Sequence, residues 1–190
     1  MNMKKIMMMA LMALVAVAVQ AADDKVTLTS GDGQWIWEIG KTATVEMDYS
    51  NTVAEGEPLM QHLKKRGDQI VADWPALAET ARLRFIEQFN RRIKKGLRVV
   101  ESGEADTNIK IIVEKLHFGN TATAVIFGGL GSAGGAEITG KMIVTDKDGK
   151  TLATYDLHEV RGRGAYDFTE GKRLGAVYDQ MIRMVVKASK

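Results

Sequence analysis

The sequence has 190 residues, with 26 Lys and Arg against 24 Asp and Glu, and it contains no cysteine. The absence of cysteine excludes a disulfide framework, a thiolate metal site and a lipid anchor attached through a cysteine. Because nucleic-acid binding needs a strongly basic surface, the near balance of charge gives no support to a nucleic-acid partner.

The first 21 residues are typical of a secretory signal peptide. Lys4 and Lys5 precede an uncharged apolar run, Ile6–Val19, and small residues follow it. The run is shorter than the roughly 20 residues that cross a bilayer, which argues against a retained membrane anchor. We therefore expect cleavage after Ala21 or Ala22.

A cleaved leader predicts a periplasmic or secreted protein that is neither a lipoprotein nor a transmembrane protein. The expected organisation is a signal peptide over residues 1–21 followed by a single α+β domain over residues 22–190. A chain of this length can bury about 70% of its unfolded surface, so it needs no second domain.

The first half of the mature chain alternates between strand patterns and turn signals. Val26–Thr29 and Gln34–Ile39 flank a Gly-rich turn and predict a β-hairpin. Thr42–Tyr49 alternates apolar and polar residues, the pattern of a half-buried strand. Ser50–Pro58 is predicted to be a loop, and Leu59–Arg66 a short helix that stops at the following glycine.

The longest predicted element is an amphipathic helix over Asp73–Gly96. Asp73 can cap the first turn, Pro75 falls where no backbone donor is needed, and Gly96 can adopt the left-handed conformation that closes a helix. The apolar residues repeat every fourth position and predict one buried face, made of Leu77, Ala81, Phe85, Phe89 and Ile93.

The second half predicts more strands and a final helix. Leu97–Val100 and Asn108–Phe118 have strand patterns, and Ala136–Asp146 and Lys150–Val160 flank an Asp-Gly hairpin turn. Asp167 begins a capping box, and a helical stripe follows, made of Leu174, Val177, Tyr178, Met181 and Val185. The expected fold class is α+β: a two-layer sandwich whose mixed, mostly antiparallel sheet of about seven strands carries two long amphipathic helices on one face.

Three partial motifs lack the context that their chemistry needs. Gly129–Gly134 satisfies a dinucleotide fingerprint, but a strand pattern follows where a helix must begin. Gly135–Met142 is one residue short of a phosphate-binding loop, because Met142 stands where a hydroxyl must bind magnesium. Asp146 and Asp148 resemble the start of a calcium loop, but Leu157 stands at the position of its final carboxylate.

The three histidines also give no complete site. His62, His117 and His158 are far apart in sequence and form no H-x-x-x-H pair, although two of them could meet across the sheet. No serine lies in a nucleophile elbow. We therefore expect no cofactor, no metal and no catalytic residue that the sequence can identify.

The candidate interaction element is the uncharged, glycine-rich segment over residues 122–136. Its apolar residues Val125, Ile126, Phe127 and Leu130 fit either a β-strand offered to a partner or a connection tucked under the domain.

Basic residues supply the other candidate sites. Arg161 and Arg163 follow a strand among glycines, where loop arginines often carry recognition. Two basic clusters, Lys64–Arg66 and Arg91–Arg98, are compatible with anionic lipid or glycan, although the helix dipole accounts for the second.

The order of these features resembles uncharacterised small exported proteins of the Gram-negative cell envelope, of the domain-of-unknown-function type. The segments that carry the resemblance are Phe85–Asn90, Gly96–Val99, Ala105–Val113, Gly128–Gly135 and Asp146–Lys150. More distantly, the chain is similar to the α/β domains of envelope assembly lipoproteins such as the curli-secretion pore subunit, but it lacks their lipidated cysteine. The resemblance implies a fold and carries over no catalytic residue.

We therefore expect an exported, non-catalytic binding or envelope-assembly module whose partner is an envelope protein, a glycan or a lipid. One alternative is an envelope polymer hydrolase whose carboxylates come together only in the fold. The other is a membrane-associating oligomer that uses residues 122–136, and a homo-oligomer is compatible with either of the binding roles.

Overall fold

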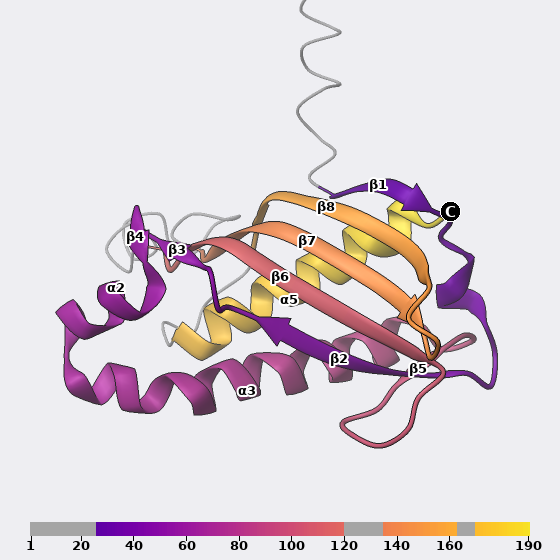
Figure 1. The fold of residues 1–190 in the computed structure, drawn as a ribbon, viewed down its shortest axis with the longest axis horizontal. Helices are drawn as coiled ribbons and strands as arrows, with labels where there is room; N and C mark the ends of the chain where they lie inside the picture. Colours follow the sequence, from indigo (N-terminus) through magenta and orange to yellow (C-terminus); the bar gives the residue numbers. More distant parts are fainter. Residues whose placement is uncertain (1–25, 120–134, 163–169) are drawn as a thin grey trace, which may run out of the picture.

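The computed structural model describes residues 26–119, 135–162 and 170–190, which form one sheet with helices on one of its faces (Figure 1). The strands are β1 (Val26–Gly31), β2 (Thr42–Asp48), β3 (Val53–Ala54), β4 (Glu57–Pro58), β5 (Arg98–Val99), β6 (Thr107–His117), β7 (Glu137–Asp146) and β8 (Thr151–Arg161). The helices are the 3-10 helix η1 (Gln34–Trp37) and the α-helices α2 (Leu59–Arg66), α3 (Asp68–Arg92) and α5 (Glu170–Ala188).

The eight strands run in the order β1-β8-β7-β6-β2-β5, and β3 pairs with both β4 and β6. Most pairs are antiparallel, whereas β2 lies parallel to both β5 and β6, and β3 lies parallel to β6. α5 packs against β1, β8 and β7, and α3 packs against β2, β5 and α5. The predicted two-layer α+β class is confirmed.

The apolar stripes of the two long helices form the interior. Ala81, Phe85, Phe89 and Ile93 are buried on or just after α3, as the fourfold repeat predicts. The predicted stripe of α5 is buried as well: Leu174, Val177, Tyr178, Met181 and Val185. The capping residue predicted for this helix, Asp167, lies outside the described residues.

The ends of α3 differ from the prediction. The helix begins at Asp68, directly after Gly67, so Asp73 and Pro75 lie inside it. Gly67 has a φ of 128°, which allows α2 and α3 to follow one another with a sharp bend. The helix ends at Arg92, and Gly96 is needed for a different reason, because a Cβ there would lie 2.3 Å from the backbone oxygen of Ile36.

The predicted N-terminal hairpin is wrong. Gln34–Trp37 forms η1, and β1 pairs with β8. Tertiary packing overrides the alternating pattern, because consecutive Trp35 and Ile36 are both buried and the Trp35 ring stacks on Phe89 at a centroid distance of 6.0 Å.

The segment predicted as a loop over Ser50–Pro58 contains β3 and β4. β3 pairs with β6 beyond the end of β2, and Thr52 Oγ1 donates a hydrogen bond to Val113 O at 2.5 Å between the two pairings. The hairpin of β7 and β8 is confirmed. Among the described residues, no helix is long and apolar enough to cross a membrane.

Candidate binding site on the open face of the sheet

Within residues 26–119, 135–162 and 170–190, one face of the sheet carries no helix, and this face is turned toward the viewer in Figure 1. Burial alternates along β2, β6, β7 and β8, so the less buried residue of each step points to this side. We call this surface the open face; it is formed by Thr44, Glu46, Asp48, Asn108, Lys110, Ile112, Lys141, Ile143, Thr145, Thr154 and Asp156.

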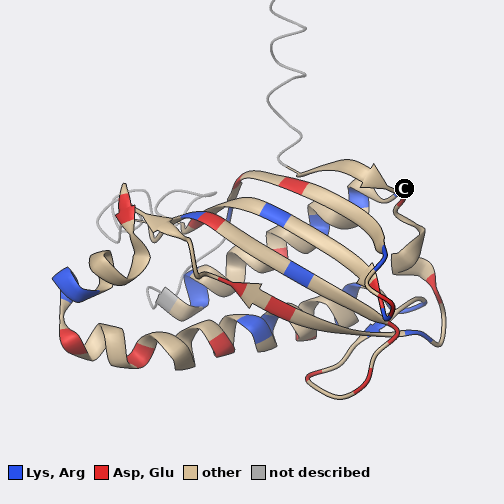
Figure 2. Ribbon diagram, in the orientation of Figure 1, with Lys and Arg blue, Asp and Glu red and all other residues tan. Residues whose placement is uncertain are grey.

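Charged residues on the open face are paired across strands. Lys110 Nζ lies 3.1 Å from Glu46 Oε1 and 3.1 Å from Asp48 Oδ2. Figure 2 shows this basic position on β6 beside the acidic positions of β2. Both carboxylates raise the pKa of Lys110. The three side chains therefore form a cross-strand ion-pair network on this face.

Asp48 is the most strongly perturbed of these groups. Ser50 donates to Asp48 Oδ1 from its Oγ at 2.6 Å and from its backbone N at 3.0 Å. These hydrogen bonds, together with Lys110, lower the pKa of Asp48 from 3.8 to about 2. Asp48 is therefore an anion at every physiological pH.

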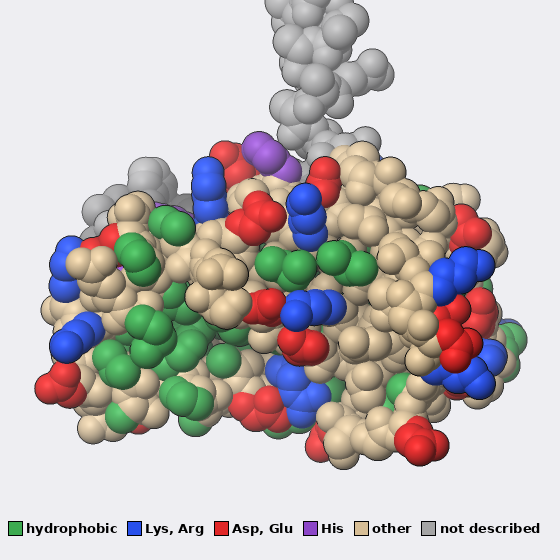
Figure 3. All heavy atoms as spheres, viewed as in Figure 1, with side chains coloured by type: hydrophobic (Ala, Val, Ile, Leu, Met, Phe, Trp, Pro, Cys, Tyr) green, Lys and Arg blue, Asp and Glu red, His purple; other side chains and the backbone are tan. Residues whose placement is uncertain are grey.

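A small aliphatic centre interrupts the charges. Ile112 faces Lys141 across the β6–β7 pair, and Ile143 lies two residues further along β7, so the two isoleucines are diagonal neighbours. Both are half-buried, and Figure 3 shows a short apolar band across the middle of this face between acidic and basic side chains. An apolar centre with a polar rim is the common pattern of protein interfaces.

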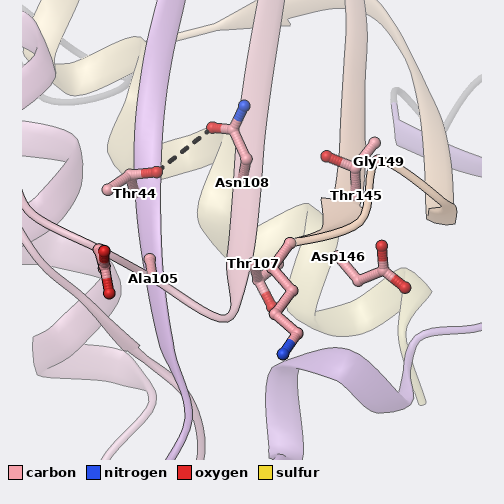
Figure 4. Close-up of a pocket in the computed structure, with 9 residues that line it drawn as sticks. Thr44, Ala105, Thr107, Asn108, Thr145, Asp146 and Gly149 are labelled. Atoms are coloured by element: carbon pink, nitrogen blue, oxygen red, sulfur yellow. Dashed lines mark hydrogen bonds between the residues drawn. The ribbon is translucent and has the colours of Figure 1, made fainter.

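A first pocket of about 540 Å³ lies at one end of the open face, beside the β7–β8 turn, and we call it the turn pocket. Thr44, Asn108 and Thr145 point into it (Figure 4), and Thr44 Oγ1 lies 3.4 Å from Asn108 Oδ1. These side chains offer neutral donors and acceptors, which suit a hydroxyl-rich or amide ligand.

Asp146 also lines the turn pocket, but its carboxylate belongs to the turn. Its Oδ1 accepts hydrogen bonds from the backbone N of Asp148 at 3.0 Å and of Lys150 at 2.9 Å. The resemblance of this segment to a calcium loop is thus accounted for by a hairpin.

A second pocket of about 420 Å³ lies at the opposite end, where β6 and β8 end and β7 begins. We call it the strand-end pocket; its charged and histidine side chains are Glu55, Lys115, His117, Glu137, His158 and Glu159. His117 and His158, far apart in sequence, both line this pocket. Within the described ranges, no three histidine or acidic residues are grouped so that they could hold a metal ion.

Backbone strain is concentrated in the strand-end pocket. Glu55 and Glu159 have φ values of 50° and 48°, and they are the only residues other than glycine with positive φ in the described chain. Glu55 opens the tight turn between β3 and β4, and Glu159 lies at a bulge opposite Thr139. Such strain is enriched at functional sites, and bulges re-aim side chains there.

The carboxylates of this pocket have partners. Glu55 Oε2 lies 2.6 Å from His117 Nδ1, and Glu55 Oε1 accepts from the backbone N of Phe118 at 3.2 Å. Glu137 Oε2 accepts from Arg161 Nε at 2.8 Å. These contacts fix the direction of two carboxylates, as a binding surface requires.

Of the predicted interaction residues, the structure describes Arg161. It is the last residue of β8 and pairs with Glu137 at the edge of the strand-end pocket. The other predicted residues lie outside the described residues and stay predictions: Val125, Ile126, Phe127, Leu130 and Arg163.

Sequence reasoning missed the three glutamates of the strand-end pocket. Glu55, Glu137 and Glu159 come from three separate strands or turns, and only the pairing register brings them together. Gly56 was the one available signal, because glycine is common at the second position of a two-residue turn with positive φ.

Comparison with known proteins gives little support for an assignment. No family model matches the sequence, and no curated protein matches it. Among solved structures, a dodecamer of a PelC variant from Paraburkholderia phytofirmans is similar with a TM-score of 0.41 and 12% sequence identity. The alignment covers 84% of this chain and 95% of the PelC chain. A likeness at this level assigns neither family nor function.

Proposed function

We propose that the protein is an exported, non-catalytic binding or assembly module of the cell envelope, and that it binds its partner through the open face. The observation that carries this proposal is a surface of four strands on which the described part of the chain places no helix. This surface has an aliphatic centre, paired charges and a pocket at each end. The leader pattern of residues 1–21 supports export.

The arrangement of the open face favours binding over chemistry. Lys110 is held between Glu46 and Asp48, so these side chains lose little freedom when a partner docks. Ile112 and Ile143 add an apolar surface that a partner can cover. The partner that best complements the open face is an envelope protein whose own surface has an apolar centre and a charged rim.

Site-specific photo-crosslinking tests the surface. A photoreactive residue placed at Ile143 is expected to give a discrete protein adduct in intact cells, whereas one placed at exposed Arg84 on α3 is the matched control and gives none. Adducts of equal yield at both positions, or none at Ile143, would contradict the open-face proposal. The intact mass of the purified protein tests export, because it must correspond to a chain that begins after Ala21 or Ala22.

A hydrolase acting on envelope polymers is the second candidate, and the strained glutamates of the strand-end pocket favour it. Glu159→Gln should abolish release of reducing ends from envelope glycans if this candidate is right. The binding proposal expects no glycan cleavage by the wild-type protein. It also expects the Ile143 crosslink to persist in Glu159→Gln.

A further inference from the structure

Two segments far apart in sequence lie side by side at the β5 end of the molecule (Figure 1). Leu97 N donates to Ile36 O at 3.0 Å, and Arg98 N donates to Lys41 O at 3.0 Å. These hydrogen bonds place the turn that follows η1 against the stretch that follows α3. An apolar turn and a basic cluster are thereby brought together.

The turn exposes two large apolar side chains. Ile39 is 79% exposed and Trp37 is 37% exposed, whereas Trp35 and Trp74 are 2% and 8% exposed. Burial of Trp35 and Ile36 beneath them fixes the turn to the core. The exposed side chains of Trp37 and Ile39 are therefore attached to a turn that is anchored in the core. Their exposure to water is unfavourable, and a binding role would explain it.

The neighbouring basic residues are accessible. Lys94, Lys95 and Arg98 are exposed, and within the described ranges neither lysine makes an ion pair. Because α3 ends at Arg92, these lysines lie beyond the helix, and its dipole does not account for them fully.

The other charges at this end are mostly committed elsewhere. Arg92 Nη2 lies 2.7 Å from Asp179 Oδ1, and Lys41 Nζ lies 3.2 Å from Asp106 Oδ1. Glu38, between Trp37 and Ile39, is the acidic residue of the turn itself. Among the described residues, the charged side chains at this end that form no ion pair therefore have a net positive charge.

We propose that this surface, the Trp37 edge, docks on a lipid membrane with anionic headgroups; it is formed by Trp37, Ile39, Lys94, Lys95 and Arg98. Tryptophan and isoleucine enter the interfacial layer, and lysine and arginine contact the headgroups. A protein partner is the weaker match, because lysine is depleted at protein interfaces. The proposal is independent of the open face, since it concerns a different surface and a different class of ligand.

Two apolar side chains and three cations predict weak, reversible docking that depends on salt. Tryptophan fluorescence is the most direct readout, because Trp37 is the exposed one of three tryptophans and the leader contains none. Vesicles of phosphatidylcholine and phosphatidylglycerol in a two-to-one mixture should shift the emission to the blue. Vesicles of phosphatidylcholine alone, or a high concentration of NaCl, should abolish the shift.

Matched variants distinguish docking through the Trp37 edge from non-specific adsorption to vesicles. Lys94→Glu with Lys95→Glu should weaken vesicle co-sedimentation by more than about tenfold, since each lysine near an anionic surface contributes about fivefold. Ile39→Ser should weaken it as well, and Trp37→Phe should remove the spectral shift while binding persists. Met60→Ser with Lys64→Glu and Lys65→Glu, on exposed residues of α2, is the control and should bind as wild type.

Several results would overturn the proposal. They are an unshifted emission with anionic vesicles, equal binding to neutral vesicles, and equal loss in the α2 control. Retention of a protein from envelope extract by the wild type and not by Ile39→Ser, with no vesicle binding, would assign the Trp37 edge to a protein partner instead. Thermal unfolding of each variant shows whether a loss of binding reflects a loss of fold.

Discussion

Trp35 Nε1 donates a hydrogen bond to the phenol oxygen of Tyr155 at 3.0 Å, which joins η1 to the middle of β8. Ser189 Oγ donates to Val185 O at 2.8 Å, so at its 2.6 Å contact with Ser189 the Tyr155 hydroxyl is the donor. Burial raises the pKa of Tyr155 above its ordinary value. One phenol oxygen thus connects η1, the sheet and the end of the chain that follows α5.

Tyr155→Phe should lower the free energy of unfolding by about 1–3 kcal/mol, because it leaves the buried Trp35 N–H and Ser189 hydroxyl short of a partner. Urea unfolding measures the loss. The double variant with Trp35→Phe is the control, and it should show less than the sum of the two single losses. Strictly additive losses would mean that the hydrogen bond contributes nothing.

Asp48→Asn should lower the free energy of unfolding at neutral pH by about 1 kcal/mol, a modest value because solvent screens the partly exposed group. The pKa of Asp48 is depressed from 3.8 to about 2 in the folded state, so this stabilisation is present above pH 3.8 and is lost as the pH falls toward 2. The difference between variant and wild type should therefore shrink as the pH falls through 2 and vanish only below it. Ser50→Ala should show a smaller version of the same profile, whereas a constant difference across this range would contradict the assignment.

Glu159→Gly should raise the free energy of unfolding by up to about 1 kcal/mol, because glycine relieves the left-handed backbone at φ 48°. Glu114→Gly is the matched control: Glu114 is also an exposed glutamate at a strand bulge, but its φ is not positive. That change should be destabilising by about 0.5–1 kcal/mol. A loss of stability in Glu159→Gly would show that the contacts of the Glu159 side chain outweigh the strain.

Gly140→Ala should be destabilising by about 1–3 kcal/mol or more, because a Cβ at this position would lie 2.0 Å from Ile112 O in the adjacent strand. Gly171→Ala on α5, where the nearest atom lies at 3.8 Å, is the control and should cause no loss. Thermal unfolding compares the two variants. A neutral Gly140→Ala would mean that β6 and β7 can separate locally at no measurable cost.

Periodicity in the sequence predicted the elements whose packing is regular. The stripe from Ala81 to Ile93 and the alternation of β6 and β7 each follow one buried face, so the sequence pattern and the burial agree. The start of α3 escaped prediction because Asp73 is a good capping residue in isolation, yet its side chain accepts from Gln69 Nε2 inside the helix at 2.8 Å. A local capping signal at Asp73 does not show that the residues before it, from Asp68 on, already belong to the helix.

The candidate binding surfaces were less predictable than the fold. Arg161 is predicted as an interaction residue because it stands beside a glycine at a strand end. The structure shows that it pairs with Glu137, and its role in binding stays a prediction. Glu55 and Glu159 were not predicted as candidates, because their positive φ and their position in the strand register are not visible in residue type. The exposed turn at Ile39 was not predicted either, because the alternating pattern of Gln34–Ile39 favoured a hairpin strand.

The pairing of β1 with β8 has a consequence for folding. Thr29 Oγ1 donates to Thr154 O at 3.2 Å across 125 residues of sequence. β2 likewise pairs with β6, which follows it much later in the sequence. Such a high contact order makes folding slow, because long loops must close before these strands gain their partners. If the chain is exported N-terminus first, β1 and β2 therefore leave the membrane before their partner strands. The chain would then remain unfolded, and so suited to transport, until β8 had crossed the membrane.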